Sequence, residues 1–436
     1  MVSSLKDASG RIEKTLTGSR FRYNTFLLVR ANVVTQALLL LATPILTRLF
    51  SPDEFGAAGL FLVGAALFGA CASFRFEWSI PSAHGDKDAQ SLAALSIALS
   101  AVVALLLFCA FLIIDQGVLF GFVGMQPIPF SLLLPPLAFA TSVVAILSAV
   151  YVRMRSLEKV SHSKYIQSGT LLAGNLATGL LGLGAFGLIL SYTLAVCAGA
   201  VSLLYKVPFQ LALGPKALRR LAAVARRYAA QASASTAVSL VNFTFANCMP
   251  LLLLWGYSVR EVGFYFVAMR LAGAPAALIS SGISSSFWGE AANLAKRDPL
   301  GLRRMYLKVV RGLFLMSLPV AAGCLAAPFF LPVLLGADDW GEIGLMVVAC
   351  LPQIVATLVF SSTNHLIVYD RQVFQLISDL LSIAGSLAAL WIAKSLDWPF
   401  WAAVLAISSV ILCSYLLRFF LHLKANDEAV RAHVQL

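Results

Sequence analysis

Arg270 is the residue whose place in the sequence most clearly suggests chemistry, because it is a cation inside the apolar stretch 263–288. If this stretch is a helix that rises 1.5 Å per residue, Arg270 lies about 10 Å inside it. Ala274, Ala277 and Ser281 follow on the same helical face, and Ser281 is a further candidate for ligand binding. A charge at such a depth is costly and usually faces an aqueous cavity or a charged partner. We therefore predict that Arg270 binds an anion, with snorkelling or a purely structural ion pair as the alternative.

Two more arginines and several amide and hydroxyl side chains lie in or beside other apolar stretches. Arg30 is about five residues from one end of the stretch 25–47, so a cavity role and snorkelling to the surface both stay open. Arg48 follows the other end of that stretch. Polar stripes along this stretch and along 232–255 suit hydrogen bonds to an oxygen-rich ligand. The candidate ligand-binding residues on these stripes are Asn32, Gln36, Ser239 and Asn242.

Acidic residues are rare at the same depth. Glu77 lies at the end of the stretch 56–76 and Asp379 lies inside the stretch 373–393, and we predict a role in gating or ion coupling for both. Asp379 could hold a proton or a coupling ion, H+ or Na+, or it could pair with a nearby arginine. Fixed cations with few acids favour an anionic ligand over a cationic one.

The residue types needed for covalent or metal chemistry are present but scattered. The five histidines have no metal-ligand spacing, and the seven cysteines lie in apolar runs without a CxxC pair. Residues 182–187 fit GxGxxG, yet no alternation of strand and helix surrounds them. We therefore predict no enzymatic activity, no metal and no cofactor.

Long apolar stretches are the elements that must position these side chains. Charged residues make up 12% of the chain, whereas a soluble domain carries roughly 25%. A helix crosses a bilayer with about 20 apolar residues. We predict an all-α integral membrane protein with about twelve transmembrane helices in two six-helix bundles related as a parallel pseudo-repeat. The expected spans are residues 25–47, 56–76, 91–114, 129–151, 165–182, 186–205, 232–255, 263–288, 306–330, 343–367, 373–393 and 399–421.

Basic residues indicate orientation rather than a nucleic-acid partner. Most of the 32 lysines and arginines fall in alternate segments between the stretches, which also accounts for the net charge of +12. Because basic loops stay in the cytoplasm, both termini are predicted to be cytoplasmic. Membrane lipids are the expected surroundings, and nucleic acid is not an expected partner.

A basic segment and a short repeat divide the chain. Residues 206–230 are predicted to be a cytoplasmic amphipathic linker on anionic headgroups, between an N-terminal lobe, 1–205, and a C-terminal lobe, 231–436. The segment Ser51–Gly56 recurs as Ser258–Gly263, with Ser-x-x-Glu at the start of each copy. Ser-x-x-Glu is a helix-capping box. The equivalent position of the copies favours duplication over two independent helix starts.

Four segments, Thr47–Gly56, Phe74–Pro81, Gly184–Leu190 and Val262–Pro275, together resemble the bacterial polysaccharide repeat-unit flippases. These flippases are a branch of the multidrug/oligosaccharidyl-lipid/polysaccharide (MOP) exporter superfamily, which also holds the MATE antiporters and the lipid II flippases. The resemblance implies two bundles around a central cavity that opens alternately to each side. It also implies a cargo oligosaccharide linked through diphosphate to a polyprenyl lipid.

The resemblance also bears on single residues. Arg270 matches a cavity arginine of the similar lipid II flippases, which implies that it holds the diphosphate through charge-assisted hydrogen bonds. Arg48 matches a recurrent arginine, for which capping, gating and binding stay open. Arg30 has no matched counterpart, and the stretch 25–47 lacks the acidic residue typical of MATE ion sites.

The function that this resemblance implies is transfer of a lipid-linked repeat unit from the cytoplasmic to the outer leaflet of the bacterial inner membrane. This step would serve O-antigen, capsule or exopolysaccharide assembly, with a polysaccharide polymerase and a chain-length regulator as partners. The alternative is a cation-coupled small-molecule exporter of the MATE type. A membrane glycosyltransferase or polymerase is less favoured, because the sequence offers neither paired carboxylates nor a large outer loop.

Overall fold

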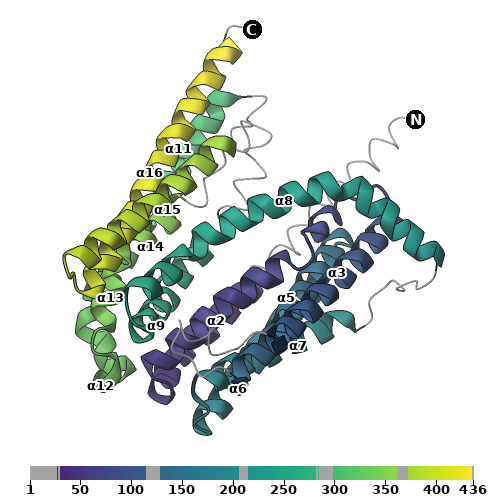
Figure 1. Ribbon diagram of the computed structural model, residues 1–436. Helices are drawn as coiled ribbons and strands as arrows, with labels where there is room; N and C mark the ends of the chain where they lie inside the picture. The colour runs from purple at the N-terminus through teal and green to yellow at the C-terminus, as the bar shows by residue number, and fades with distance from the viewer. Residues whose placement is uncertain are drawn as a thin grey trace, which may run out of the picture.

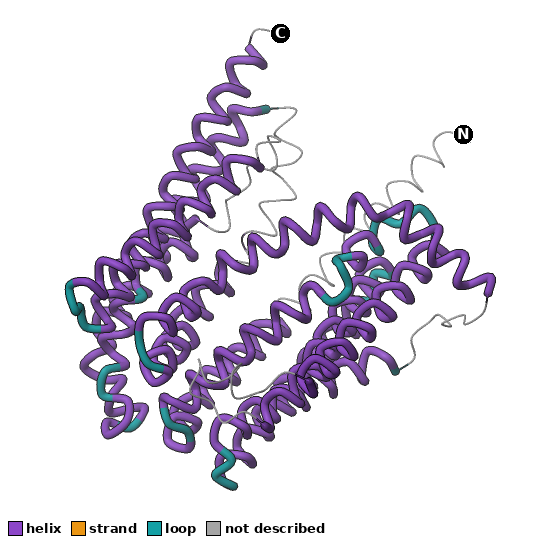
Figure 2. The backbone as a smooth tube through the Cα atoms, viewed as in Figure 1, coloured by secondary structure: helices purple, strands orange, loops and turns teal. Residues whose placement is uncertain are grey.

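The computed structural model describes residue 27 and residues 30–113, 128–205, 215–280, 283, 298–360 and 372–434. Within these residues the secondary structure is helical, with no strand (Figure 2). The first helix is Arg30–Leu49. The later elements are α2 (Pro52–Cys71), η1 (Phe76–Ser79), α3 (Asp86–Ile113), α5 (Ile128–Arg153), α6 (Leu157–Leu180), α7 (Gly184–Leu204), α8 (Pro215–Gly256), α9 (Val259–Ala268), η2 (Met269–Gly273), α11 (Pro299–Leu335), α12 (Ala337–Trp340), α13 (Ile343–Ala349), α14 (Leu351–Phe360), α15 (Gln372–Ser395) and α16 (Phe400–Val434).

Where the structure describes them, the predicted spans correspond to helices. Nine helices of the described residues are long and apolar enough to cross a membrane, and the number rises to 11 if each of two bent pairs is one span. The bent pairs coincide with the predicted spans 232–255 and 343–367. The predicted span 165–182 is the later part of α6, which is too polar to be among these candidates. The protein is therefore an all-helical, multi-pass membrane protein.

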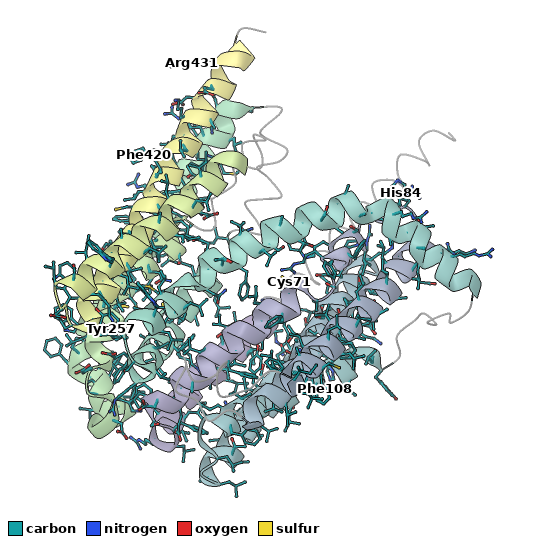
Figure 3. The ribbon with its side chains drawn as sticks, viewed as in Figure 1. Cys71, His84, Phe108, Tyr257, Phe420 and Arg431 are labelled. Atoms are coloured by element: carbon teal, nitrogen blue, oxygen red, sulfur yellow. The ribbon has the colours of Figure 1, made fainter. Side chains whose placement is uncertain are left out.

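The helices gather in two groups (Figure 1). One group holds α2, α3, α5, α6 and α7, the other holds α9 and α11 to α16, and α8 runs from the first group to the second. The groups converge where α2 and α9 begin, and they diverge toward the ends that carry His84 and Arg431 (Figure 3). Large apolar side chains such as Phe108 and Phe420 remain exposed on the helices, as expected of surfaces that face lipid.

The two copies of the repeated segment pack against each other. Each begins its helix with a capping box, in which Ser51 pairs with Glu54 and Ser258 pairs with Glu261. A Cβ atom at Gly56 would overlap the backbone carbonyl of Val259. A Cβ atom at Gly263 would likewise overlap the carbonyl of Pro52. Glycine is therefore needed at both positions for α2 and α9 to approach so closely.

An aromatic cluster closes the same end of the molecule. Trp340 is completely buried and donates its indole N–H to the Thr47 carbonyl at 2.9 Å. Its ring meets Phe55 of α2 edge-on at 5.6 Å between centroids and Phe264 of α9 at 5.5 Å. Trp340 thus contacts both groups of helices at the point where they converge.

The predicted linker continues into a membrane helix. Residues 215–230 form the first part of α8, which runs to Gly256, and residues 206–214 lie outside the described residues. Val224, Tyr228 and Ala232 are buried against η1 and α3. The apolar face of this part of α8 therefore contacts the first group of helices rather than lipid. The domain boundaries themselves stay a prediction.

Candidate functional site

Arg270 lies at an irregular turn of a membrane-spanning helix. The helix Val259–Ser280 is α-helical at its start and changes to a π-helix at η2, which contains Arg270. Pro275 follows, and its missing N–H removes one rung of the α-helical hydrogen-bond ladder. Single π-turns of this kind widen the helix and are frequent at functional sites.

Arg270 lines a cavity of about 250 Å³ between the two groups of helices. Most of the wall is apolar, and the first helix, α2, α6 and α7 supply most of it. Asn175 of α6 and Tyr192 of α7 are the other polar side chains of the lining. The full lining is Leu39, Phe55, Ala58, Gly59, Leu62, Leu171, Asn175, Leu188, Tyr192, Phe266, Val267 and Arg270.

The polar groups of this cavity are not satisfied by the protein. In the described part of the chain, the Arg270 guanidinium has neither a hydrogen bond nor an ion pair. The Asn175 side chain is only 3% exposed, and its Oδ1 atom has no partner within the described residues. A buried cation and a buried amide oxygen without partners are costly, so a ligand that engages both gains affinity. The combination suits an anion with further hydrogen-bonding groups, held in apolar surroundings.

The other predicted residues of the first helix lie outside this cavity. Arg30 is exposed and lines a separate groove of about 920 Å³ with Lys159 and His162. Arg48 is exposed at the opposite end of the helix. Asn32 accepts a hydrogen bond of 2.6 Å from Lys164 of α6, and Gln36 is half-buried.

The predicted residues of the second half do not line the cavity either. Ser239 is buried in α8, and its hydroxyl has no partner among the described residues. Asn242 is exposed on the same helix. Ser281 lies outside the described residues. Arg270 is thus the one predicted ligand-binding residue, of those described, that the structure places in this cavity.

Both predicted carboxylates are buried beside an arginine. Glu77 of η1 accepts a hydrogen bond from Ser73 and lies 3.5 Å from the Arg75 guanidinium. Asp379 of α15 pairs with Arg418 of α16. Two roles were predicted for Asp379, and the structure shows the second of them, an ion pair with an arginine.

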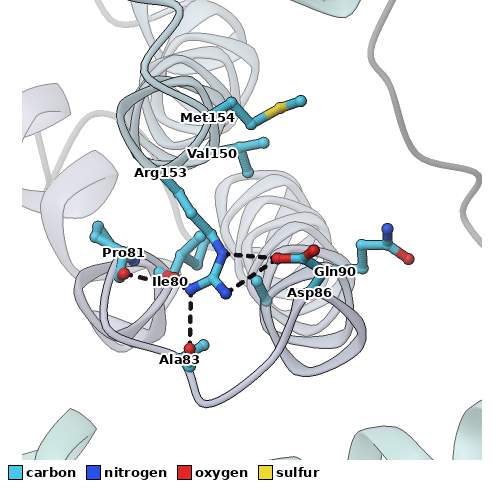
Figure 4. A pocket seen from close by; sticks show the side chains of 9 residues that line it. Ile80, Pro81, Ala83, Asp86, Gln90, Val150, Arg153 and Met154 are labelled. Atoms are coloured by element: carbon cyan, nitrogen blue, oxygen red, sulfur yellow. Dashed lines mark hydrogen bonds and ion pairs between the residues drawn. The ribbon is translucent and has the colours of Figure 1, made fainter. Parts of the chain in front are cut away.

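A second hollow shows how a structural arginine differs from Arg270 (Figure 4). Arg153 donates to the carbonyls of Ile80, at 3.1 Å, and Ala83, at 2.9 Å, and pairs with Asp86 at 3.1 Å. These bonds hold the loop between η1 and α3 against α5. The Arg153 guanidinium is therefore engaged by the protein itself.

Comparison with known proteins identifies the family. Residues 45–344 match the family described as polysaccharide biosynthesis protein. The chain belongs to this family. No curated protein sequence matches the chain significantly.

Solved structures confirm the predicted fold of the protein. The lipid II flippase MurJ in an inward closed conformation has a TM-score of 0.66 at 11% identity, covering 95% of this chain and 90% of MurJ. An inward-facing MATE transporter of the MOP superfamily has a TM-score of 0.59 at 14% identity, covering 92% of this chain and 99% of its own. A MOP superfamily transporter from Pyrococcus furiosus, noted for the reverse polarity of its binding pocket, has a TM-score of 0.61 at 15% identity, covering 93% and 96%. The protein is thus a member of the polysaccharide biosynthesis family whose fold is similar to that of MurJ and the MATE transporters.

Two side chains of the Arg270 cavity were not predicted from the sequence. Asn175 and Tyr192 lie in predicted spans, but neither carries a charge that would mark it there. An amide in an apolar stretch is a weak signal, because most such residues bond to a neighbouring helix.

Within the described residues, no three His, Cys, Asp or Glu side chains come together as metal ligands would.

Proposed function

We propose that this transporter is a flippase for a polyprenyl-diphosphate-linked oligosaccharide repeat unit. It moves the unit from the cytoplasmic to the outer leaflet of the bacterial inner membrane by alternating access. The two lobes, residues 1–205 and 231–436, move against each other around the cargo. The product feeds O-antigen, capsule or exopolysaccharide assembly, where a polymerase and a chain-length regulator act next.

The Arg270 cavity is the observation that carries this proposal. Arg270 brings a fixed positive charge to a cavity lined mainly by the first group of helices, and no carboxylate of the described residues neutralises it. A planar guanidinium can bind two oxygens of one phosphate at once, which suits a diphosphate. Membership of the polysaccharide biosynthesis family and likeness to MurJ support an anionic lipid-linked cargo.

A cation-coupled exporter fits these observations less well. Such an exporter needs a carboxylate in the first lobe that is available to a cation. In the described part of that lobe, Glu77 is the acid with a buried side chain, and Ser73 and Arg75 already engage it. The electrostatics of the cavity at Arg270 therefore favour an anionic cargo.

Replacing Arg270 tests the proposal in cells that depend on this gene for surface polysaccharide. We expect Arg270→Ala to lower surface polysaccharide at least about tenfold, because a charge-assisted hydrogen bond contributes roughly 1.5–3 kcal/mol. Arg270→Lys keeps the charge but loses the two-pronged geometry, so it should restore function only in part. Surface polysaccharide is measured at equal amounts of membrane-inserted transporter.

Arg260→Ala is the matched control on the same helix. Arg260 is exposed, and its contacts with Asp53 at 3.9 Å and Asp339 at 3.7 Å are of the surface type that contributes about 0–1 kcal/mol. We expect this variant to make normal amounts of polysaccharide. Full function of Arg270→Ala would contradict the diphosphate assignment. Drug efflux by the wild type, with no role in surface polysaccharide, would support the exporter instead.

A further inference from the structure

Lys164 is a second partly buried cation near the first helix, and no described carboxylate neutralises its charge. It is half-buried and lies seven positions after the start of α6, about 10 Å along the helix axis. Its ammonium donates one hydrogen bond, at 2.6 Å, to the amide oxygen of Asn32. In the described part of the chain, no carboxylate lies within ion-pair distance of it. Among the described residues, the other two of its three N–H donors have no partner and can serve a ligand.

A line of polar contacts connects Lys164 with the Arg270 cavity. One turn after Lys164 on α6, Ser168 donates a hydrogen bond of 3.0 Å to Thr35 of the first helix. Leu171 and Asn175 follow on the same face of α6. These two residues line the cavity, as does Leu39, which continues the Thr35 face of the first helix. The seam between the first helix and α6 therefore runs from Lys164 to the cavity.

We propose that Lys164 binds the diphosphate of the cargo before it reaches Arg270, so that the seam holds two successive phosphate sites. This inference rests on the proposed function. Lys164 and Asn175 are 11 positions apart on α6, which corresponds to about 16 Å along the helix axis. That separation exceeds the span of one diphosphate, so Lys164 and the cavity serve different positions of the cargo along its path.

The chemistry of the two cations fits this order. An ammonium is a strongly hydrated point charge with rotatable donors, whereas a guanidinium forks around a phosphate in one fixed geometry. Lys164 therefore suits a first, readily released contact, and Arg270 suits a tighter one. Lys159, five positions earlier on α6, differs from Lys164 because its ammonium lies over the Tyr151 ring at 5.5 Å.

Binding of purified transporter to undecaprenyl diphosphate tests the inference, with undecaprenol as the uncharged probe of equal chain length. We expect Lys164→Gln to weaken diphosphate binding about fivefold to tenfold and to leave undecaprenol binding unchanged. The dependence of diphosphate affinity on salt should also become less steep, because one phosphate contact is lost. Lys164→Arg should keep most of the affinity. Lys159→Gln, which removes the same charge from the same helix, should bind within twofold of the wild type.

The outcomes separate this inference from the proposed function. If the wild type binds undecaprenol as tightly as undecaprenyl diphosphate, the flippase proposal fails. If Arg270→Ala loses the preference for diphosphate while Lys164→Gln behaves as the wild type, the flippase proposal stands and the Lys164 site is wrong. If Lys164→Gln and Lys164→Arg both lower the melting temperature and weaken both probes equally, Lys164 is a structural link between helices and the proposal is also wrong.

Discussion

Asp379 and Arg418 form a buried ion pair inside a shell of polar and aromatic side chains. Arg418 also donates to the Ser378 hydroxyl at 3.0 Å. Its guanidinium lies 4.9 Å from the ring centroids of both Phe245 and Tyr415. The pair therefore links α15 and α16 and brings both to α8. Because every charged group has a partner, this site differs from the one at Arg270.

We expect the Asp379–Arg418 pair to be structural. Asp379→Asn alone should lower the melting temperature of the purified protein, because removing one partner of a buried pair costs about 3–5 kcal/mol. Replacing both residues by apolar ones of similar size, Asp379→Leu with Arg418→Met, should recover most of this loss and retain polysaccharide transport. A stable double variant without transport would contradict this expectation and assign the pair to ion coupling.

Single charged residues could be located from the sequence, but their partners could not. Arg270 and Asp379 stand out because a charge inside an apolar stretch is visible in one dimension. Arg418 lies near the end of its stretch and gave no such signal, although it is 3% exposed. Arg418 forms an ion pair, whereas Arg270 has no partner among the described residues. Which of these two states an arginine adopts depends on which helices pack together. That packing is a property of the fold rather than of local sequence.

The two groups of helices meet where α2 crosses α9, and the backbones of these two helices approach each other closely there. Gly56 and Gly263 occupy the same position in the two copies of the repeated segment. Without side chains there, the two backbones come within van der Waals contact. The caps at Ser51 and Ser258 fix where each helix begins and so bring the glycines into register.

A methyl group at this crossing should therefore be harmful. We expect Gly56→Ala to lower the stability of the protein by about 1–3 kcal/mol, the usual cost of overpacking, and to reduce surface polysaccharide. Gly64→Ala is the matched control on α2, since a Cβ atom there would meet no heavy atom within 4 Å. Thermal unfolding of the purified variants measures the difference. Equal stability of the two variants would show that the helices can separate slightly at no cost.

The sequence predicted where helices begin better than it predicted which helices pack together. Both capping boxes predicted from Ser-x-x-Glu are present. From residue 215, the amphipathic segment before the second half is the first part of α8. Its apolar face could bury against lipid or against protein, and amphipathicity alone cannot distinguish the two. Arg220 and Arg227 both pair with Asp88 of α3, and Tyr228 contacts His84, so the first group of helices covers that face.

At the end of the molecule where α2 and α9 begin, contacts between the two groups of helices hold the groups together. Trp340 is buried between Phe55 and Phe264, one from each group. The groups diverge at the opposite end (Figure 1). If cargo crosses by alternating access, the closed end must open during each cycle, and the crossing of α2 and α9 must separate. The same contact therefore has to be strong enough to close the path and weak enough to break.

Holding α2 and α9 together should stop transport. Asp53 and Arg260 face each other across the two helices, with 3.9 Å between their charged atoms. In a variant whose seven native cysteines are replaced, Asp53→Cys with Arg260→Cys provides two thiols for a short, reducible bis-thiosulfonate cross-linker. We expect surface polysaccharide to fall as cross-linking becomes complete and to recover after reduction, because the closed end can then open again. Each single cysteine variant treated with the same reagent should transport normally, which separates cross-linking from simple modification. Undiminished transport by fully cross-linked protein would mean that this end stays closed throughout the cycle, and the cargo would then have to leave between the groups elsewhere.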